Sequence, residues 1–274
     1  MRTISAAAIA DAVRGMVIDA NTRLGDDVMA AFRRGAREEA SPIGRAVYET
    51  LIQNAEIAAA ENVPICQDTG MAVFFVELGQ DAHVEGGLLQ DAVDDGVRRG
   101  YAEGYLRKSI CDPFSRVNTK DNTPSVVIVE VVKGDRVKIT AAPKGGGSEN
   151  MSRLAMLAPS AGKKGIVDFV VKRCEEAGSN PCPPVIVGVG VGGSAEKCVT
   201  IAKKALFREI GSVNPDAELA ELEAEMLKKI NALGMGPQGL GGTTYAMAVH
   251  VEKHPCHIAS LPVAVNICCH ASRH

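Results

Sequence analysis

Cysteine is the residue type most able to do chemistry in this chain, which carries eight of them. Three lie in separate polar, glycine-rich or proline-rich segments: Cys66 in ICQDTG, Cys182 in NPCPPVIVG and Cys269 in VNICCHASR. Each segment is predicted to be a loop or a strand edge. Because these thiols are far apart along the chain, their spacing forms no local ligand cluster. Reduced cysteines can be buried hydrophobic residues, redox residues or metal ligands, and the spacing alone leaves the choice open.

The ICQDTG segment combines a thiol, an amide and a carboxylate on one loop. Cys66 is followed by Gln67 and Asp68, and the Thr69-Gly70 pair then turns the chain into an apolar run. Polar side chains on a loop beside a rigid element are typical of a functional site. The alternative is a buried cysteine at a turn, with Asp68 acting only as a cap. The residues by themselves favour neither interpretation.

A glycine motif and a histidine-rich end offer two other chemistries. Gly188, Gly190 and Gly193 match G-x-G-x-x-G before a helix, with Glu209 about twenty residues on. No βαβ unit surrounds them, so a strand-to-helix turn that needs glycine is favoured over nucleotide binding. Zinc is conceivable near the C-terminus, but no paired C-x-x-C spacing supports it. The residues concerned are His250, His254, His257, His270 and His274, with Cys256, Cys268 and Cys269.

Composition narrows the class of protein. The 274 residues are 46% hydrophobic and 23% charged, with a formal net charge of −3, which excludes a strongly basic nucleic-acid binder. Aromatic residues make up only 4%, too few for a base-stacking platform. The N-terminus has no signal-like apolar run, and no stretch approaches the roughly 20 apolar residues that span a bilayer. We therefore expect a cytoplasmic protein that binds neither membrane nor nucleic acid and keeps its thiols reduced.

The hydrophobic pattern predicts helices first and an α/β mixture afterwards. Residues 1–62 show three segments with apolar residues at helical spacing, which predicts an N-terminal helical subdomain. Strand patterns then alternate with helical ones, and residues 125–132 and 136–144 look like a β-hairpin around KGD. The predicted fold class is α/β (α+β mixed), with a mixed sheet flanked by helices.

Four motifs together resemble a known family. ICQDTG, NPCPPVIVGVGVGG, GMGPQGLGG and the HIASLPVAVNICCHASR ending are similar to the N-terminal, iron–sulfur-binding part of class I fumarate hydratases. The match is nearest to the α subunit of the two-subunit form, and L-tartrate dehydratase α subunits are near relatives. The resemblance runs over residues 1–274, so it implies one domain of the iron–sulfur hydro-lyase α-subunit type.

The resemblance implies a [4Fe–4S] cluster held by three cysteines, with one iron open as a Lewis acid. By motif the ligands are Cys66, Cys182 and Cys269. Cys268 is the alternative third ligand, because neighbours on a strand point to opposite faces and only one can bind. The other cysteines are then ordinary reduced thiols: Cys111, Cys174, Cys198 and Cys256.

The resemblance also assigns residues to the substrate. Gln67 and Asp68 would contact it, with Asp68 transferring a proton or orienting a hydroxyl. Arg107 would bind a carboxylate through its planar guanidinium. Gly145, Gly146 and Gly147 would offer backbone N–H groups to an anion. His257 would face the substrate near the open iron. Each residue also has a plainer interpretation. Asp68 could be a turn cap and Arg107 a solvated arginine. The three glycines could be a flexible exit from the hairpin, and His257 could be structural.

The family also implies partners. Its single-chain members carry a further C-terminal domain, whereas this chain ends five residues after Cys269. We therefore expect a β subunit that completes the active site, α–α contacts giving a heterotetramer, and a dicarboxylate substrate. The KGGGSENMS stretch favours reversible hydration of fumarate to (S)-malate over dehydration of L-tartrate. A non-catalytic iron–sulfur or zinc-binding protein is the alternative from another class.

Overall fold

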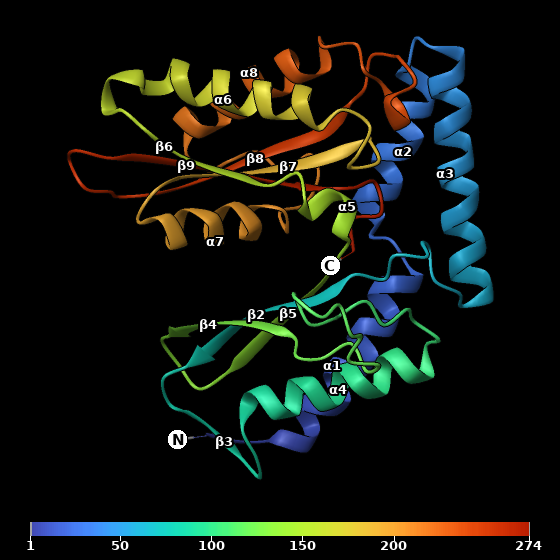
Figure 1. Cartoon of the computed structure of the whole chain (residues 1–274), viewed down its shortest axis with the longest axis vertical. Helices are drawn as coiled ribbons and strands as arrows, with labels where there is room; N and C mark the ends of the chain where they lie inside the picture. Colours follow the sequence, from blue (N-terminus) through green and yellow to red (C-terminus); the bar gives the residue numbers. More distant parts are fainter. Residues whose placement is uncertain (1, 274) are drawn as a thin grey trace. The chain divides into compact units, whose positions relative to one another are not determined.

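The computed structural model describes residues 2–273 and contains two compact units. Unit 1 comprises Met1–Leu24, Asn54–Gly146 and Arg273–His274, and unit 2 comprises Gly25–Gln53 and Gly147–Ser272. Each unit combines helices with a β-sheet (Figure 1), so the predicted mixed α/β class is confirmed. No helix among the described residues is long and apolar enough to cross a membrane.

Unit 1 is built on a three-stranded sheet and a pair of helices. The strand order is β4-β2-β5, and a separate parallel pair joins β1 to β3. The helices of this unit include the second half of α3. The bounds are β1 (Arg2–Ser5), α1 (Ala6–Thr22), α3 (Pro42–Glu61), β2 (Met71–Gly79), β3 (Ala82–Glu85), α4 (Leu89–Glu103), β4 (Val126–Val132) and β5 (Val137–Lys144).

Helices α1 and α4 pack closely because small residues face each other. In α1, Val13 and Val17 lie four residues apart on one face and are fully buried. A Cβ added at Gly96 would lie 2.5 Å from the Ala10 carbonyl oxygen, and one at Gly100 would lie 2.3 Å from a Val17 methyl group. Only glycine permits this approach. The pair forms a hydrophobic core with β2.

The predicted β-hairpin is wrong, because β2 lies between its two strands. β2 runs parallel to β4 and antiparallel to β5. The turn wraps around the end of β2, where the N–H groups of Gly79 and Gln80 donate to Arg136 and Val132 at 2.8 Å each. The KGD turn was identified correctly. The insertion of a strand from earlier in the chain is a long-range contact that local pattern does not contain.

Unit 2 is a four-stranded sheet, order β6-β9-β7-β8, covered on both faces. Helices α6 and α8 lie on one face and α7 on the other (Figure 1). The larger hydrophobic core lies under α6 and α8. The bounds are α2 (Asp26–Glu38), α5 (Gly146–Glu149), β6 (Arg153–Leu157), η1 (Pro159–Ala161), α6 (Gly162–Ala177), β7 (Val185–Gly192), α7 (Ala195–Ala205), α8 (Ala217–Asn231), η2 (Pro237–Gly239), β8 (Ala246–His254) and β9 (Leu261–Cys268).

The glycine motif is the strand-to-helix connection between β7 and α7, as predicted. A Cβ at Gly188 or at Gly190 would lie only 2.1 Å from a backbone carbonyl oxygen of α7. Gly192 has a φ of +86°, which side chains rarely adopt. Ser194 then caps α7 by accepting the Lys197 N–H at 3.3 Å. Close helix-on-strand packing therefore accounts for these glycines.

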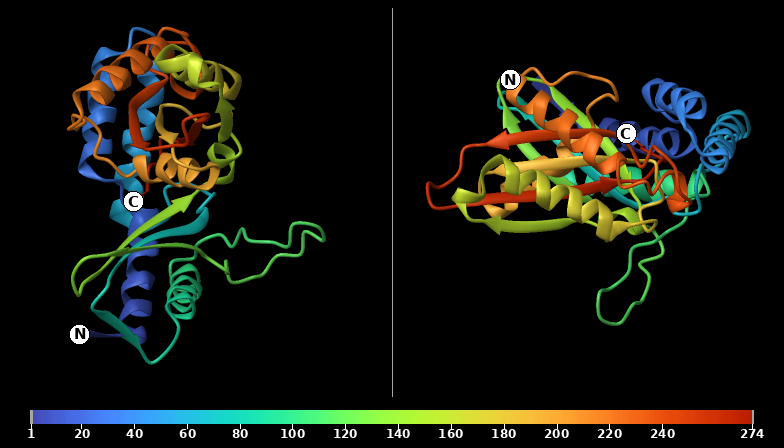
Figure 2. Two further views of the ribbon diagram at one scale, coloured as in Figure 1. Left: turned by 90° about the vertical axis from the view of Figure 1, so that its left-hand side faces the viewer. Right: turned by 90° about the horizontal axis from the view of Figure 1, so that it is seen from above.

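The three helices predicted within residues 1–62 are α1, α2 and α3. The boundaries between the units fall after Leu24 and after Gln53, so this segment is shared between both units. Its behaviour as a helical subdomain stays a prediction. In unit 1 the segment between α4 and β4 extends from the sheet as a long loop (Figure 2).

Candidate functional site

The loop that follows α3, which contains Cys66–Gly70, is held within unit 1 by two hydrogen bonds of Thr69. The Thr69 hydroxyl donates to the Arg107 carbonyl oxygen at 2.8 Å. The buried Tyr101 hydroxyl donates to the Thr69 carbonyl oxygen at 2.7 Å. Burial raises the pKa of Tyr101 far above its usual range, so this hydroxyl stays a donor. The structure therefore brings the Cys66–Gly70 loop and the Arg107 backbone together, although they are 38 residues apart.

Asp68 joins this loop to the glycine-rich segment. One carboxylate oxygen accepts the Gly70 N–H at 3.0 Å, and the other accepts the Gly146 N–H at 2.8 Å. A Cβ on Gly145 would approach the second oxygen to 3.2 Å, so the glycine allows the carboxylate to lie close. Asp68 thus has the geometry of a cap that also fixes Gly146, one of the three predicted anion-binding glycines.

Cys66 lies half-buried beside Asp68, with its sulfur 3.4 Å from the Asp68 backbone nitrogen. Its thiol also contacts the Gln67 side-chain oxygen at 3.5 Å. The backbone N–H directed at the sulfur fixes the orientation of the Cys66 side chain. Gln67 and Arg107 are both exposed, so their side chains are free to meet a solute.

Arg273 is a site residue that the sequence suggested only through the spacing C-x-A-x-R after Cys269. Its guanidinium is buried in unit 1 and donates to the Asp68 carbonyl oxygen at 2.6 Å and to the Asn21 side chain at 3.0 Å. Its Nε is buried without a partner among residues 2–273. Arg273 therefore supports the backbone of the loop that carries Cys66, and it places a positive charge beside Asp68.

The two other predicted ligands, Cys182 and Cys269, lie at the same end of the two central strands of the unit 2 sheet. Cys182 precedes β7, is exposed and has a left-handed φ of +53°. Strand β9 runs antiparallel to β7 with Ile186 opposite Cys268, so the start of β7 lies beside the end of β9. The His270 backbone N–H lies 3.3 Å and its Nδ1 3.0 Å from the Cys182 carbonyl oxygen. The structure therefore brings the segments of Cys182 and Cys269 together.

Cys268 and Cys269 differ in their surroundings. Cys268 is the last residue of β9 and is buried, whereas Cys269 follows the strand and is half-buried, with its sulfur 3.7 Å from the Ala271 carbonyl oxygen. The choice of Cys269 as third ligand stays a prediction.

His257 lies at the opposite end of the same strands. It belongs to the loop between β8 and β9, is exposed, and accepts the Ala259 N–H through Nδ1 at 3.1 Å. The eight residues of β9 separate this loop from Cys269, a length of about 26 Å at roughly 3.3 Å per residue. Within unit 2, His257 is therefore not brought to Cys182 or Cys269.

No three His, Cys, Asp or Glu side chains among residues 2–273 form a group that could hold a metal ion. Of the residues considered for zinc, His250 is buried with Nδ1 at 3.1 Å from the Ala205 carbonyl oxygen, and burial lowers its pKa. His274 lies outside the described residues. Burial raises the pKa of Cys174 to about 12 and that of Cys198 to about 11. These two thiols have the properties of inert core residues.

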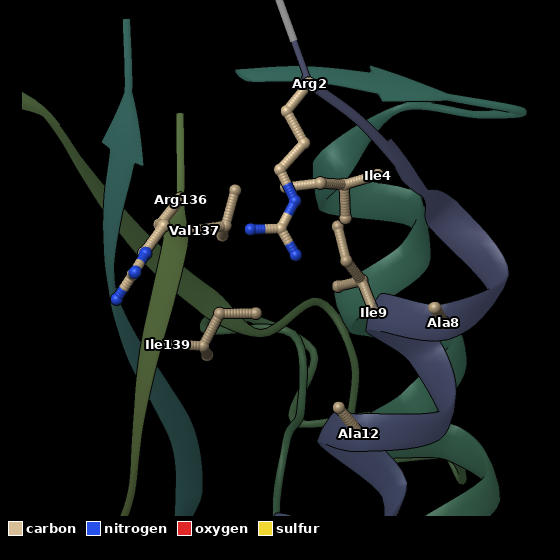
Figure 3. A pocket seen from close by; sticks show the side chains of 8 residues that line it. All are labelled: Arg2, Ile4, Ala8, Ile9, Ala12, Arg136, Val137 and Ile139. Atoms are coloured by element: carbon tan, nitrogen blue, oxygen red, sulfur yellow. The ribbon is translucent and has the colours of Figure 1, made fainter. Parts of the chain in front are cut away.

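A separate cavity of about 490 Å³ lies in unit 1 between the β1–α1 segment and β5 (Figure 3). Its walls are mainly aliphatic, including Ile4, Ile9, Val137 and Ile139, and the Arg2 guanidinium points into it. The lining contains no carboxylate, thiol or imidazole, so the chemistry expected from the sequence does not belong to this cavity.

Comparison with known proteins agrees with the resemblance inferred from the motifs. The family described as fumarate hydratase (Fumerase) matches residues 10–274. A Methanocaldococcus jannaschii protein, provisionally named as the alpha subunit of L(+)-tartrate dehydratase, is 41% identical over 271 residues, 97% of this chain and 95% of that protein. The L(+)-tartrate dehydratase alpha subunit of Escherichia coli (strain K12) is 36% identical over 257 residues, covering 92% of this chain and 84% of that protein.

Proposed function

This chain belongs to the fumarate hydratase (Fumerase) family, and on that premise we propose that it is the α subunit of an iron–sulfur hydro-lyase. The proposed reaction is the reversible hydration of fumarate to (S)-malate. The observation that carries it is the link between Cys66, Asp68 and Gly146 in unit 1, which holds a thiol, a carboxylate and a glycine amide in one place. A reducing cytoplasm, where thiols stay available as ligands, is the proposed location.

Cys66, Cys182 and Cys269 would hold a [4Fe–4S] cluster. The chemistry of these donors fits, because the three thiols are exposed or half-buried whereas Cys174 and Cys198 are buried with raised pKa values. When bound, the cluster supplies a Lewis-acid iron.

The chain's own residues would bind and orient the dicarboxylate. Arg107 presents an exposed guanidinium from a backbone that Thr69 holds, and this planar group suits a carboxylate. Gln67 follows Cys66 and offers an amide. Gly145, Gly146 and Gly147 would line the position of a second carboxylate, with Asp68 fixing the Gly146 amide.

Asp68 is the proposed proton-transfer residue. Its two carboxylate oxygens accept the N–H groups of Gly70 and Gly146, which holds the side chain in a fixed orientation beside Cys66. The Arg273 guanidinium donates to the Asp68 carbonyl oxygen and so fixes the backbone of the same residue. In the hydration direction, Asp68 would accept a proton from water as the hydroxyl adds to one alkene carbon, and that proton would then pass to the adjacent carbon.

Within its own unit, His257 lies beyond the far end of β9 from Cys269, and that strand is about 26 Å long at roughly 3.3 Å per residue, so His257 does not reach Cys269 there. We propose that the α–α contact supplies it. Complementation between two variants tests this directly. A chain with Cys66→Ser and a chain with His257→Asn should each be inactive alone. A mixed dimer contains one intact site, which combines Cys66 of the His257→Asn chain with His257 of the Cys66→Ser chain. Recovery of about a quarter of the activity is expected for random pairing, and no recovery would contradict the proposal.

A β subunit is the proposed partner, since the relatives are named as α subunits of a tartrate dehydratase. We expect the purified α chain to show negligible hydratase activity until the β chain is added. Strong activity of the α chain alone, measured anaerobically by the loss of fumarate absorbance, would refute the need for this partner.

L(+)-Tartrate is the second candidate substrate, and the names of the relatives favour it. Fumarate rests on the KGGGSENMS stretch, in which the Gly146 N–H donates to Asp68. The two substrates differ in the hydroxyl groups that they present to the site, so the reconstituted α–β pair should discriminate between them. Anaerobic measurement of kcat/KM for fumarate, (S)-malate and L(+)-tartrate decides the question, and a higher value for tartrate would replace the fumarate assignment.

A further inference from the structure

The loop between α8 and β8 holds the segment that follows Cys182. Gln238 lies in this loop, within η2, and has a left-handed φ of +54°. Its backbone N–H donates to the Pro183 carbonyl oxygen at 2.8 Å, and its side-chain amide donates to the same oxygen at 2.6 Å. One residue therefore satisfies both lone pairs of this carbonyl.

His270 completes the contact from the other side. Its backbone N–H and its Nδ1 both lie within hydrogen-bond distance of the Cys182 carbonyl oxygen, at 3.3 and 3.0 Å. The Gln238 amide nitrogen lies 3.3 Å from the same ring nitrogen. The consecutive carbonyls of Cys182 and Pro183 are thus held by Gln238 and by the neighbour of Cys269.

Glu39 anchors the same loop to the turn between α2 and α3. It is 1% exposed, and its carboxylate accepts the N–H groups of Ser41 at 2.9 Å, Thr243 at 2.8 Å and Thr244 at 2.9 Å. Burial by itself would raise its pKa, but these donors outweigh that effect and the pKa is lowered. A Cβ at Gly242 would lie 2.7 Å from a Glu39 oxygen, so the loop fits closely around the carboxylate.

We propose that Gln238 is a positioning residue that holds Cys182 and Cys269 in register before an iron–sulfur cluster is loaded, with Glu39 as the anchor of its loop. The inference rests on the proposed function and deepens it. Cys182 is exposed and precedes β7, so strand pairing does not restrain its backbone directly. Ligands whose supporting hydrogen bonds are removed typically lose about 10–100-fold in metal affinity.

The test compares Gln238→Ala with Leu240→Ala in the full-length chain. Leu240 is in the same loop and 58% exposed, so its truncation perturbs the loop without touching Pro183 or His270. In the chain before cluster loading, we expect Gln238→Ala to speed hydrogen exchange of the amides of Cys182, Val185 and His270. The denaturant midpoint should match that of Leu240→Ala. Equal hydrogen-exchange rates in both variants would show that the hydrogen bonds of Gln238 do not restrain this segment.

Cluster retention supplies the second readout. After anaerobic reconstitution, iron release to a chelator should be about 10-fold faster or more from Gln238→Ala than from wild type and from Leu240→Ala. Glu39→Gln should act in the same direction, and Gln238→Ala keeps the test valid if Glu39→Gln fails to fold. Equal release rates would overturn the positioning role while leaving the proposed function intact. Failure of the wild type to take up iron would overturn the proposed function itself, which is a distinguishable result.

Discussion

Replacement of Gly190 by alanine tests whether packing explains the glycine motif. The added Cβ would lie 2.1 Å from the Cys198 carbonyl oxygen, 2.9 Å from an Ile201 carbon and 3.0 Å from the Ala202 nitrogen. The first of these is shorter than an ordinary carbon–oxygen contact by roughly 1 Å, and the atom that the new methyl group meets there belongs to the backbone of α7. Helix α7 must therefore move away from β7 by a similar distance, which loosens the small core around Cys198 and Ala202.

We expect Gly190→Ala to lower the free energy of unfolding by about 2–3 kcal/mol, at the upper end of the usual cost of overpacking. Gly15→Ala is the matched control, because Gly15 is exposed on α1 and a methyl group added there would meet no atom within 4 Å. There the same chemical change should stabilise the protein by about 0.5–1 kcal/mol through helix propensity. Urea denaturation followed by circular dichroism measures both, and a Gly190→Ala protein as stable as wild type would refute the packing argument.

Asp68, His250 and the cysteines supply three further predictions. Asp68→Asn leaves one of two backbone N–H groups without an acceptor, so unfolding should become easier by about 1.5–3 kcal/mol and activity of the α–β pair should fall, as measured by denaturation and by fumarate hydration. Burial lowers the pKa of His250 below 6.5, so the unfolded chain binds the proton more readily. Stability should therefore decline below pH 6.5 more steeply in wild type than in His250→Gln, and parallel curves would contradict this. Iodoacetamide at mildly alkaline pH should label exposed Cys256 but spare Cys174 and Cys198 in the native protein, as mass spectrometry can check.

Local pattern predicted the elements well where one segment decides its own structure. The apolar spacing of α1, the strand at Met71–Gly79 and the glycine turn after β7 all depend on residues close in sequence. The insertion of β2 between β4 and β5 does not, because β2 comes from a much earlier part of the chain than the two strands that it joins. Hydrophobic alternation is the same in a strand whichever neighbour it pairs with.

The candidate site shows the same division. The ICQDTG loop drew attention to Cys66 and Asp68 through their residue types, and the structure ties them to Gly146. The sequence did not indicate Gln238 or Glu39, because each matters through its hydrogen bonds to distant backbone groups. Gln238 contacts Pro183, 55 residues away, and Glu39 contacts Thr243, 204 residues away. The motif alone indicated His257. The pairing of β9 with β7 shows that, within its own unit, His257 lies at the other end of the strands from Cys269.

Iron and sulfide content after anaerobic reconstitution tests the central claim most directly. The wild-type chain, together with the proposed β subunit, should take up a four-iron cluster. Single replacements of Cys66, Cys182 and Cys269 by serine should each abolish stable uptake, whereas Cys268→Ser should retain it. A wild-type protein that binds zinc or no metal, or a cluster that survives Cys269→Ser but not Cys268→Ser, would contradict the account.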